Sequence, residues 1–310
     1  MKKTHWITVV LLLGLLLACS SNSEDDTTSE IPKAVDKTAN LLGTGDSAND
    51  LLSNDNFTKL KIEIAYVDGF RPTQEAMDGF MAFLRERTFK DAIEVVFTEL
   101  ESPGEEDLTL DEIADLESEN RTVYNDGDTL AVYIYFGDAP AEGDDLEEGL
   151  VTLGAVYRNT SMIIHEVTVR RLADQSIFIF DADVENATLN HEFGHLFGLV
   201  NLGTEPVNDH EDIQRDENGE PVLDEEGMTM GNSHCDVEGC LMRAELQFGG
   251  PSNKGKSKYA KSETGLKPGC ILSGKSMLKL LESQAAKGPM VDPPNLDSEC
   301  LLDLASNGGR

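Results

Sequence analysis

Residues 191–201 read HEFGHLFGLVN and place two histidines four positions apart, with a glutamate directly after the first. Residues i and i+4 lie on one face of a helix, so His191 and His195 can bind the same metal ion. Apolar residues flank the pair, and Gly198 is typical of a helix that ends just after the second histidine. The spacing therefore predicts a zinc site on a helix.

Glu192 lies beside the first of these ligands, close enough to reach a water molecule on the ion. Zinc with three protein ligands keeps a fourth position open, lowers the pKa of water to about 7 and polarises a carbonyl. Glu192 can accept the proton of that water and deliver it to a leaving amine. The pattern indicates peptide-bond hydrolysis. The alternative is a surface protein that binds peptides or glycans without cutting them, which would not need Glu192.

The third ligand is not settled by these residues. Three positions after Gly198 the chain has Asn201, and an amide is a poor ligand for zinc. His210 is one candidate, and a site with two histidines and one carboxylate would instead use Glu211 or Glu217. His165 falls in a predicted strand and is expected to be merely exposed.

The segment 234–242, HCDVEGCLM, resembles the end of the archaemetzincin signature. Archaemetzincins are a branch of the metzincin metallopeptidases and read HExxHxxGxxH, then C, four residues, C, one residue, M. Here the signature is split after Gly198 by an acidic insertion over residues 202–231. The resemblance implies His234 as the third ligand of one catalytic Zn²⁺. It also implies that Met242 packs in the turn beneath the metal and is not a ligand.

The resemblance covers residues 60–242 and implies a fold as well as a site. It implies an α/β domain over 41–310. The upper part (57–200) would contain a twisted, mixed five-stranded sheet, a backing helix and the active-site helix. The lower part (232–305) would be irregular and contain the Met-turn. Residues 151–157 would form the edge strand that pairs with an extended protein or peptide substrate.

The five cysteines depart from the family pattern. Archaemetzincins carry a CxxC after the methionine that completes a second, four-thiolate zinc site, but no cysteine stands at that position here. Asp297 and Cys300, in DSEC, resemble a remnant of it. Apart from Cys19, four cysteines remain, which allows two disulfides in three possible pairings. They are Cys235, Cys240, Cys270 and Cys300. In an exported protein, a disulfide between Cys235 and Cys240 is the simplest expectation.

The first residues, MKKTHWITVVLLLGLLLACS, join a basic start to an apolar run that is short for a membrane span. This predicts a signal peptide over 1–18, and LLAC resembles the bacterial lipobox, with lipid attached to Cys19. An uncleaved anchor is the alternative and predicts the same membrane attachment. Residues 19–40 are polar and acidic, like the tethers of lipoproteins carried to the cell surface. We therefore expect a lipoprotein of the outer membrane.

The 310 residues are 39% hydrophobic and carry a net charge of −33. The hydrophobic fraction supports a packed core. The charge argues against nucleic acid as a partner, because the protein and the nucleic acid are both strongly negative and would repel each other. The sequence leaves the oligomeric state open.

The elements that must position the site alternate in type, which predicts an α/β sheet. Strands are predicted at 60–67, 92–100, 129–137, 151–157 and 162–169, and 176–180 is also β-rich. Helices are predicted at 72–87, at 109–120 with a cap by Thr109 and Glu112, from about 183 through the motif, and at 275–286.

Overall fold

The computed structural model describes residues 35–144, 151–216, 218–224, 226–243, 266, 274–285 and 294–310. Residues 36–310 belong to one compact unit, and the signal peptide, Cys19 and most of the tether lie outside the described residues. The short helix η1 (Thr38–Asn40) already belongs to this unit. Buried Asn40 donates from Nδ2 to the Ala131 carbonyl oxygen at 3.1 Å. The folded domain thus begins before residue 41.

Five strands form one sheet in the order β2-β1-β3-β5-β4. Their pairings are parallel except for that of β4, which runs antiparallel to β5 at the edge of the sheet. The prediction of a mixed five-stranded α/β sheet is confirmed, and the structure shows that the sheet is mostly parallel. The strands are β1 (Lys59–Val67), β2 (Ala92–Leu100), β3 (Thr129–Gly137), β4 (Gly154–Arg158) and β5 (Ser161–His165).

The central strands β1 and β3 are buried on both faces, as parallel strands between helical layers usually are. Glu63 lies within β1 and is completely buried. Its carboxylate accepts hydrogen bonds from the backbone amides of Thr122 and Val123 at 2.9 and 2.8 Å. A charge in the middle of the sheet is therefore compensated by hydrogen bonds.

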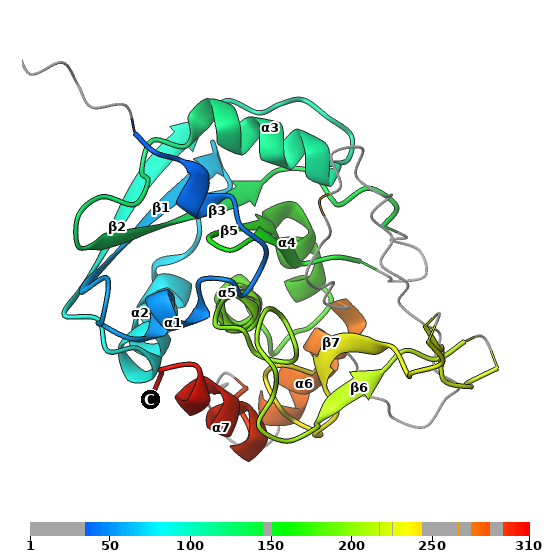
Figure 1. Ribbon diagram of the computed structural model, residues 1–310. Coiled ribbons are helices and arrows are strands. Elements are labelled where there is room, and N and C mark those ends of the chain that lie inside the picture. Colours follow the sequence, from blue (N-terminus) through cyan, green and yellow to red (C-terminus); the bar gives the residue numbers. More distant parts are fainter. Residues whose placement is uncertain are drawn as a thin grey trace, which may run out of the picture. The chain divides into compact units, whose positions relative to one another are not determined.

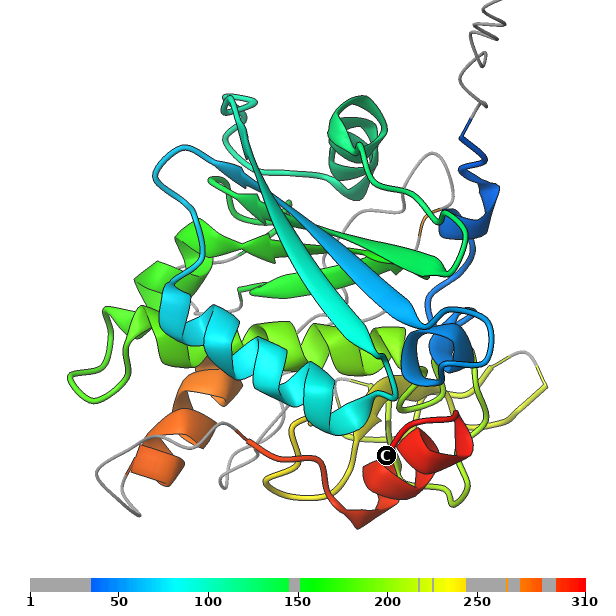
Figure 2. The ribbon, with the colours of Figure 1, turned by 90° about the vertical axis from the view of Figure 1, so that its left-hand side faces the viewer.

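Helices cover both faces of the sheet (Figures 1 and 2). Helix α3 (Leu110–Asn120) lies on one face, and its capping box forms as predicted, with Glu112 N donating to Thr109 Oγ1 at 3.2 Å. The opposite face carries the larger core, which includes residues of α2 (Gln74–Arg87), α4 (Glu166–Ala173) and α5 (Asp181–Leu196). The short α1 (Ala48–Leu52) contributes Leu51 and Leu52 to this core.

The predicted end of the last strand of the sheet is wrong, and the β-rich run over 176–180 forms no strand. The strand expected over 162–169 ends at His165, and α4 begins at Glu166, which accepts a hydrogen bond from Arg170 one helical turn later. Residues 176–180 form a connection between α4 and α5, in which Ile177 is 85% exposed and Ile179 is buried in the larger core. A β-rich composition does not make a strand where no partner strand is available.

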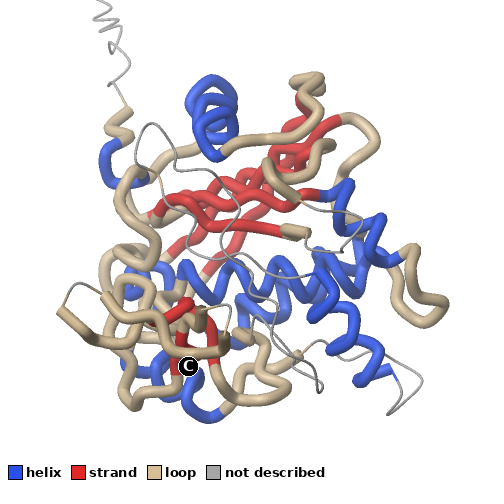
Figure 3. Tube along the Cα trace, turned by 90° about the vertical axis from the view of Figure 1, so that its right-hand side faces the viewer, coloured by secondary structure: helices blue, strands red, loops and turns tan. Residues whose placement is uncertain are grey.

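The C-terminal part lies on the side of α5 away from the sheet (Figures 2 and 3). It contains an antiparallel pair, β6 (Glu211–Ile213) and β7 (Gly231–Cys235), whose members lie at the two ends of the insertion. Helix α6 (Gly274–Ala285) was predicted, whereas α7 (Ser298–Ser306), capped by Asp297, was not. Within the described part of the chain, no helix has the length and apolarity needed to span a membrane.

Two buried carboxyl groups meet between α4, α5 and the start of α2. Glu166 accepts a hydrogen bond from Arg170 Nε at 2.6 Å, and Glu185 accepts one from the Thr73 amide at 2.8 Å. Burial, reinforced by the neighbouring Glu185, raises the pKa of Glu166 to about 9. The folded protein therefore holds a proton on Glu166 that the unfolded chain releases at neutral pH.

This raised pKa predicts how stability depends on pH. The stabilising contribution of protonated Glu166 is fully present below the ordinary glutamate pKa and is lost as the pH rises toward about 9. Glu166→Gln keeps a neutral side chain at every pH. We expect Tm of the variant to exceed that of the wild type by several degrees at pH 8.5, with the difference shrinking at pH 5. Thermal unfolding at the two pH values measures this, and a constant difference would contradict it.

Candidate metal centre and active site

Helix α5 carries the metal-binding motif and is buried on every side from Val184 to Leu196. His191 and His195 lie one turn apart, with their Nε2 atoms 3.1 Å from each other. His234, from β7, joins them, and one nitrogen of each of the three rings lies within 4.8 Å of the others. The structure thus brings together the three histidines that the sequence analysis selected.

The hydrogen bonds of two of these rings determine which nitrogen faces the cluster. His191 Nδ1 donates to the Leu241 carbonyl oxygen at 2.7 Å, and His234 Nδ1 donates to that of Asn232 at 2.9 Å. Because a carbonyl oxygen accepts only from a protonated nitrogen, the lone pairs of both rings lie on Nε2, toward the cluster. Such carbonyl contacts orient histidine ligands in metal sites, so this donor set fits zinc.

Burial also keeps the three imidazoles neutral, as metal ligands must be. It lowers the pKa of His191 to about 4 and that of His234 to about 3. The pKa of His195 falls well below the ordinary value for the same reason, with the two neighbouring histidines adding to the effect. At neutral pH no proton competes with a cation for these nitrogens.

His234 reaches the site because the two ends of the insertion are tied together. Asn201, at the position where an unbroken motif would have its third histidine, donates from Nδ2 to Glu211 Oε2 at 2.6 Å. The other oxygen of Glu211 accepts from the Ser233 amide, also at 2.6 Å. Ser233 has a φ of 61°, a left-handed conformation in which the chain turns directly before the ligand. Asn201 therefore acts through Glu211 and lies outside the histidine cluster.

Glu192 lies under the edge strand of the sheet. A Cβ atom on Gly154 of β4 would come within 2.9 Å of the Glu192 Cγ atom, so only glycine permits this approach. Burial raises the pKa of Glu192 well above the ordinary value. The Glu192 side chain thus lies against the strand expected to hold a peptide, one residue after His191 in the motif helix.

Met242 packs against the other side of the motif helix. It is fully buried, and a Cβ atom on Gly194 would come within 2.4 Å of its Sδ atom. The Met242 carbonyl oxygen accepts from the Cys235 amide at 2.9 Å, which ties this turn to β7. The methionine therefore lies against the helix between the two histidines of the motif.

The other candidate ligands lie elsewhere. His210 is outside the histidine cluster, and Glu211 forms the bridge from Asn201 to Ser233. Glu217 lies outside the described residues. The expectation of an exposed His165 is wrong: it is completely buried, its Nδ1 contacts the Ala139 carbonyl oxygen at 2.9 Å, and burial lowers its pKa to about 4.

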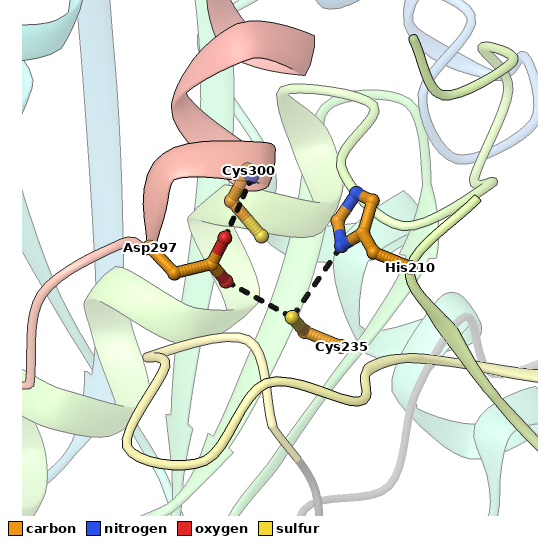
Figure 4. A group of neighbouring side chains, drawn as sticks. All are labelled: His210, Cys235, Asp297 and Cys300. Atoms are coloured by element: carbon orange, nitrogen blue, oxygen red, sulfur yellow. Dashed lines mark hydrogen bonds between the residues drawn. The ribbon is translucent and has the colours of Figure 1, made fainter. Parts of the chain in front are cut away.

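A second group of potential metal ligands was not recognised as a group from the sequence. One donor atom of each member lies within 4.8 Å of the others; the members, drawn in Figure 4, are His210, Cys235, Asp297 and Cys300. The sequence analysis linked Asp297 and Cys300 to a remnant of the second zinc site but considered His210 for the catalytic ion, since no spacing relates His210 to the cysteines.

The disulfide expected between Cys235 and Cys240 is not formed. Both thiols are free, as is that of Cys300, and Cys240 Sγ lies 3.6 Å from Cys300 Sγ. A disulfide requires about 2.05 Å between sulfurs. Cys235 instead faces Asp297 Oδ2 at 3.0 Å and His210 Nδ1 at 3.4 Å, because β7 directs it toward α7 and the start of the insertion. Cys270 lies outside the described residues.

Comparison with known proteins gives distant likenesses. No family model matches the chain, and no curated protein matches its sequence. Archaemetzincin from Methanopyrus kandleri aligns with a TM-score of 0.42 and 16% identity, over 81% of this chain and 96% of that one. A chain from a chaperone–substrate complex aligns with a TM-score of 0.30 and 14% identity, over 75% of this chain and 35% of that one. Similarity at this level decides neither fold nor activity.

The geometry of the three imidazoles predicts that His234 is needed for metal binding and Asn201 is not. Removing one of three ligands costs orders of magnitude in zinc affinity. After dialysis, His234→Ala should therefore retain one zinc equivalent fewer per chain than the wild type. Asn201→Ala, the matched control, should lose none. Elemental analysis measures both, and an unchanged zinc content in His234→Ala would contradict the assignment.

Proposed function

We propose that this protein is a zinc-dependent metallopeptidase of the metzincin type, similar to the archaemetzincins. The observation that carries the proposal is the convergence of His191, His195 and His234 at the helix that also carries Glu192, whose side chain lies against the antiparallel edge strand β4. The split signature and the packing of Met242 against Gly194 support a Met-turn in the lower part of the domain. One catalytic Zn²⁺ would be held by the three imidazoles.

The residues around the cluster have distinct tasks in this mechanism. When bound, zinc supplies an activated water and polarises the scissile carbonyl. Strand β4 pairs with an extended peptide along its outer edge and fixes the carbonyl beside the histidines. Glu192 accepts the proton of the attacking water and transfers it to the amine of the leaving peptide.

The test of catalysis is a variant that removes the base and preserves its size. Glu192→Gln should lower turnover of a quenched fluorescent peptide or casein by at least about 10²-fold, the usual contribution of a general base. Zinc content should stay at the wild-type value, because Glu192 is not a ligand. If the wild type itself cleaves no peptide while binding zinc, the protein is the non-catalytic peptide- or glycan-binding lipoprotein instead.

We also propose that the enzyme acts at the outer membrane as a lipoprotein attached through Cys19. The support is the basic start, the apolar run and the lipobox-like LLAC, which offers Cys19 as the only acceptor in this segment. The acidic segment after it would hold the catalytic domain away from the bilayer.

Membrane attachment is expected to depend on this one cysteine. Cys19→Ser should move the protein from the membrane fraction to the soluble fraction, because no thiol remains for the lipid. Cys270→Ser is a matched thiol control that should stay with the membrane. Fractionation followed by immunodetection distinguishes the two. A Cys19→Ser protein that remains membrane-bound would show that the leader itself is the anchor.

A further inference from the structure

The chain's own N-terminal segment lies at the end of the edge strand β4. Asn159 is the first residue after β4, and its backbone amide donates to the Leu42 carbonyl oxygen at 3.0 Å. The Leu42 amide in turn donates to Asn159 Oδ1, also at 3.0 Å. Leu42 thus binds the backbone amide that a longer peptide lying along β4 would otherwise reach next.

Buried amide side chains hold this segment in place. Asn159 is completely buried, and its Nδ2 donates to the Ala39 carbonyl oxygen at 2.8 Å and to Ser47 Oγ at 2.7 Å. Asn40 is also completely buried and donates to Thr160 Oγ1 at 3.1 Å. Breaking these bonds would leave buried polar groups unsatisfied, which is costly. The segment is therefore a fixed boundary at the end of the strand.

Two glycines hold the same segment against the start of the insertion. A Cβ atom on Gly45 would come within 1.8 Å of the Leu202 carbonyl oxygen, and one on Gly203 within 2.7 Å of the Gly45 carbonyl carbon. Their φ values of 84° and 78° lie in the left-handed region that favours glycine. The segment thus contacts the β4–β5 turn and, through Gly45, the chain that follows the motif helix.

The edge strand has a defined length between the motif helix and this boundary. Gly154, at the start of β4, lies against Glu192, and Asn159 is five residues further along the chain. At about 3.4 Å per residue, five residues of an antiparallel strand span about 17 Å. A peptide that pairs residue by residue with β4 therefore has room for four residues beyond the one opposite Gly154 before it meets Leu42.

The boundary presents apolar side chains to solvent. Leu41 and Leu42 are each 47% exposed. Their backbones are held by hydrogen bonds, since the Leu41 amide donates to the Thr38 carbonyl oxygen at 3.1 Å and Leu42 is bound to Asn159. A ligand that covers them therefore need not order this part of the chain. Exposed apolar surface of this kind favours an apolar residue of a bound peptide.

We propose that Leu41 and Leu42 form the last subsite of the peptide-binding edge and select substrates with an apolar residue at that position. The inference rests on the proposed function, because it concerns how a peptide extends along β4. Antiparallel pairing is the more stable arrangement, and it directs the N-terminal side of the peptide from Gly154 toward Leu42. The preferred substrate class is a polypeptide with an apolar residue four or five positions before the cleaved bond.

A leucine scan of the substrate measures this preference. In quenched fluorescent peptides with one common cleavage site, a single leucine replaces serine at each position from the second to the eighth before the cleaved bond. With leucine at the fourth or fifth position, the wild type should show a KM about tenfold lower than with serine, because a leucine side chain is buried there. The value of kcat should be unchanged, since this position lies away from the reacting bond.

Two exposed-leucine variants separate the subsite from a general effect on the fold. Leu41→Ser combined with Leu42→Ser keeps the backbone bonds to Asn159. This double variant should retain its zinc and cleave the all-serine peptide as the wild type does, but lose the tenfold preference. Leu302 on α7 is 46% exposed, and Leu302→Ser is the matched control that should keep the preference.

Two results overturn the inference: a wild type that gains nothing from leucine at the fourth and fifth positions, and a double variant that keeps the full preference. Failure of the proposed function is a separate result, seen when the wild type cleaves none of the peptides. The Kd values of the labelled peptides, measured by fluorescence anisotropy, then replace KM. A leucine preference in Kd that only the double variant lacks supports the subsite without the peptidase, and equal or unmeasurable Kd values overturn it.

Discussion

The structure depends on the burial of a helix that is rich in polar residues. From Val184 to Leu196, every residue of α5 is buried, although the segment carries two carboxyl groups, amides and imidazoles. Each such group costs free energy unless a partner compensates it. Glu185 is bonded to the start of α2 through Thr73, and Asn186 donates to the Ala76 carbonyl oxygen at 3.0 Å. The helix is therefore fixed in position by its polar side chains as well as by its apolar ones.

The same requirement explains how the lower part of the domain meets the helix. His191 satisfies Nδ1 with the Leu241 carbonyl oxygen, so the segment before Met242 must run alongside α5. At Gly194 and Gly154 the absence of a side chain lets Met242 and the edge strand approach the helix closely. One helix thus sets the distance from the histidines to the strand above them and to the turn below.

The insertion separates two halves of a site without disturbing their geometry. Asn201 and Glu211 connect its beginning to Ser233 at its end, and β6 pairs with β7 beside them. Most of the acidic residues of the segment lie beyond this junction. Length is tolerated in such an excursion because closing a loop costs little more as the loop grows, provided that its ends are held together.

The sequence by itself determined the features that depend on local geometry. Two histidines four residues apart share a helix face because an α-helix has 3.6 residues per turn, and the apolar strands and the Thr109 cap follow from equally short-range rules. It did not determine that β5 would stop at His165, that His165 would be buried, or that α7 would form. Those depend on which surfaces are available for packing.

The ligands from distant segments were decided by the tertiary structure alone. His234 could be proposed from a split motif, but its position beside His191 requires the chain to reverse across the insertion. Likewise, His210, Cys235 and Cys300 have no spacing that relates them, and Cys235 was expected to form a disulfide with Cys240. Spacing along a chain fixes distance only within one element, because the path between elements is set by the packing of the whole domain.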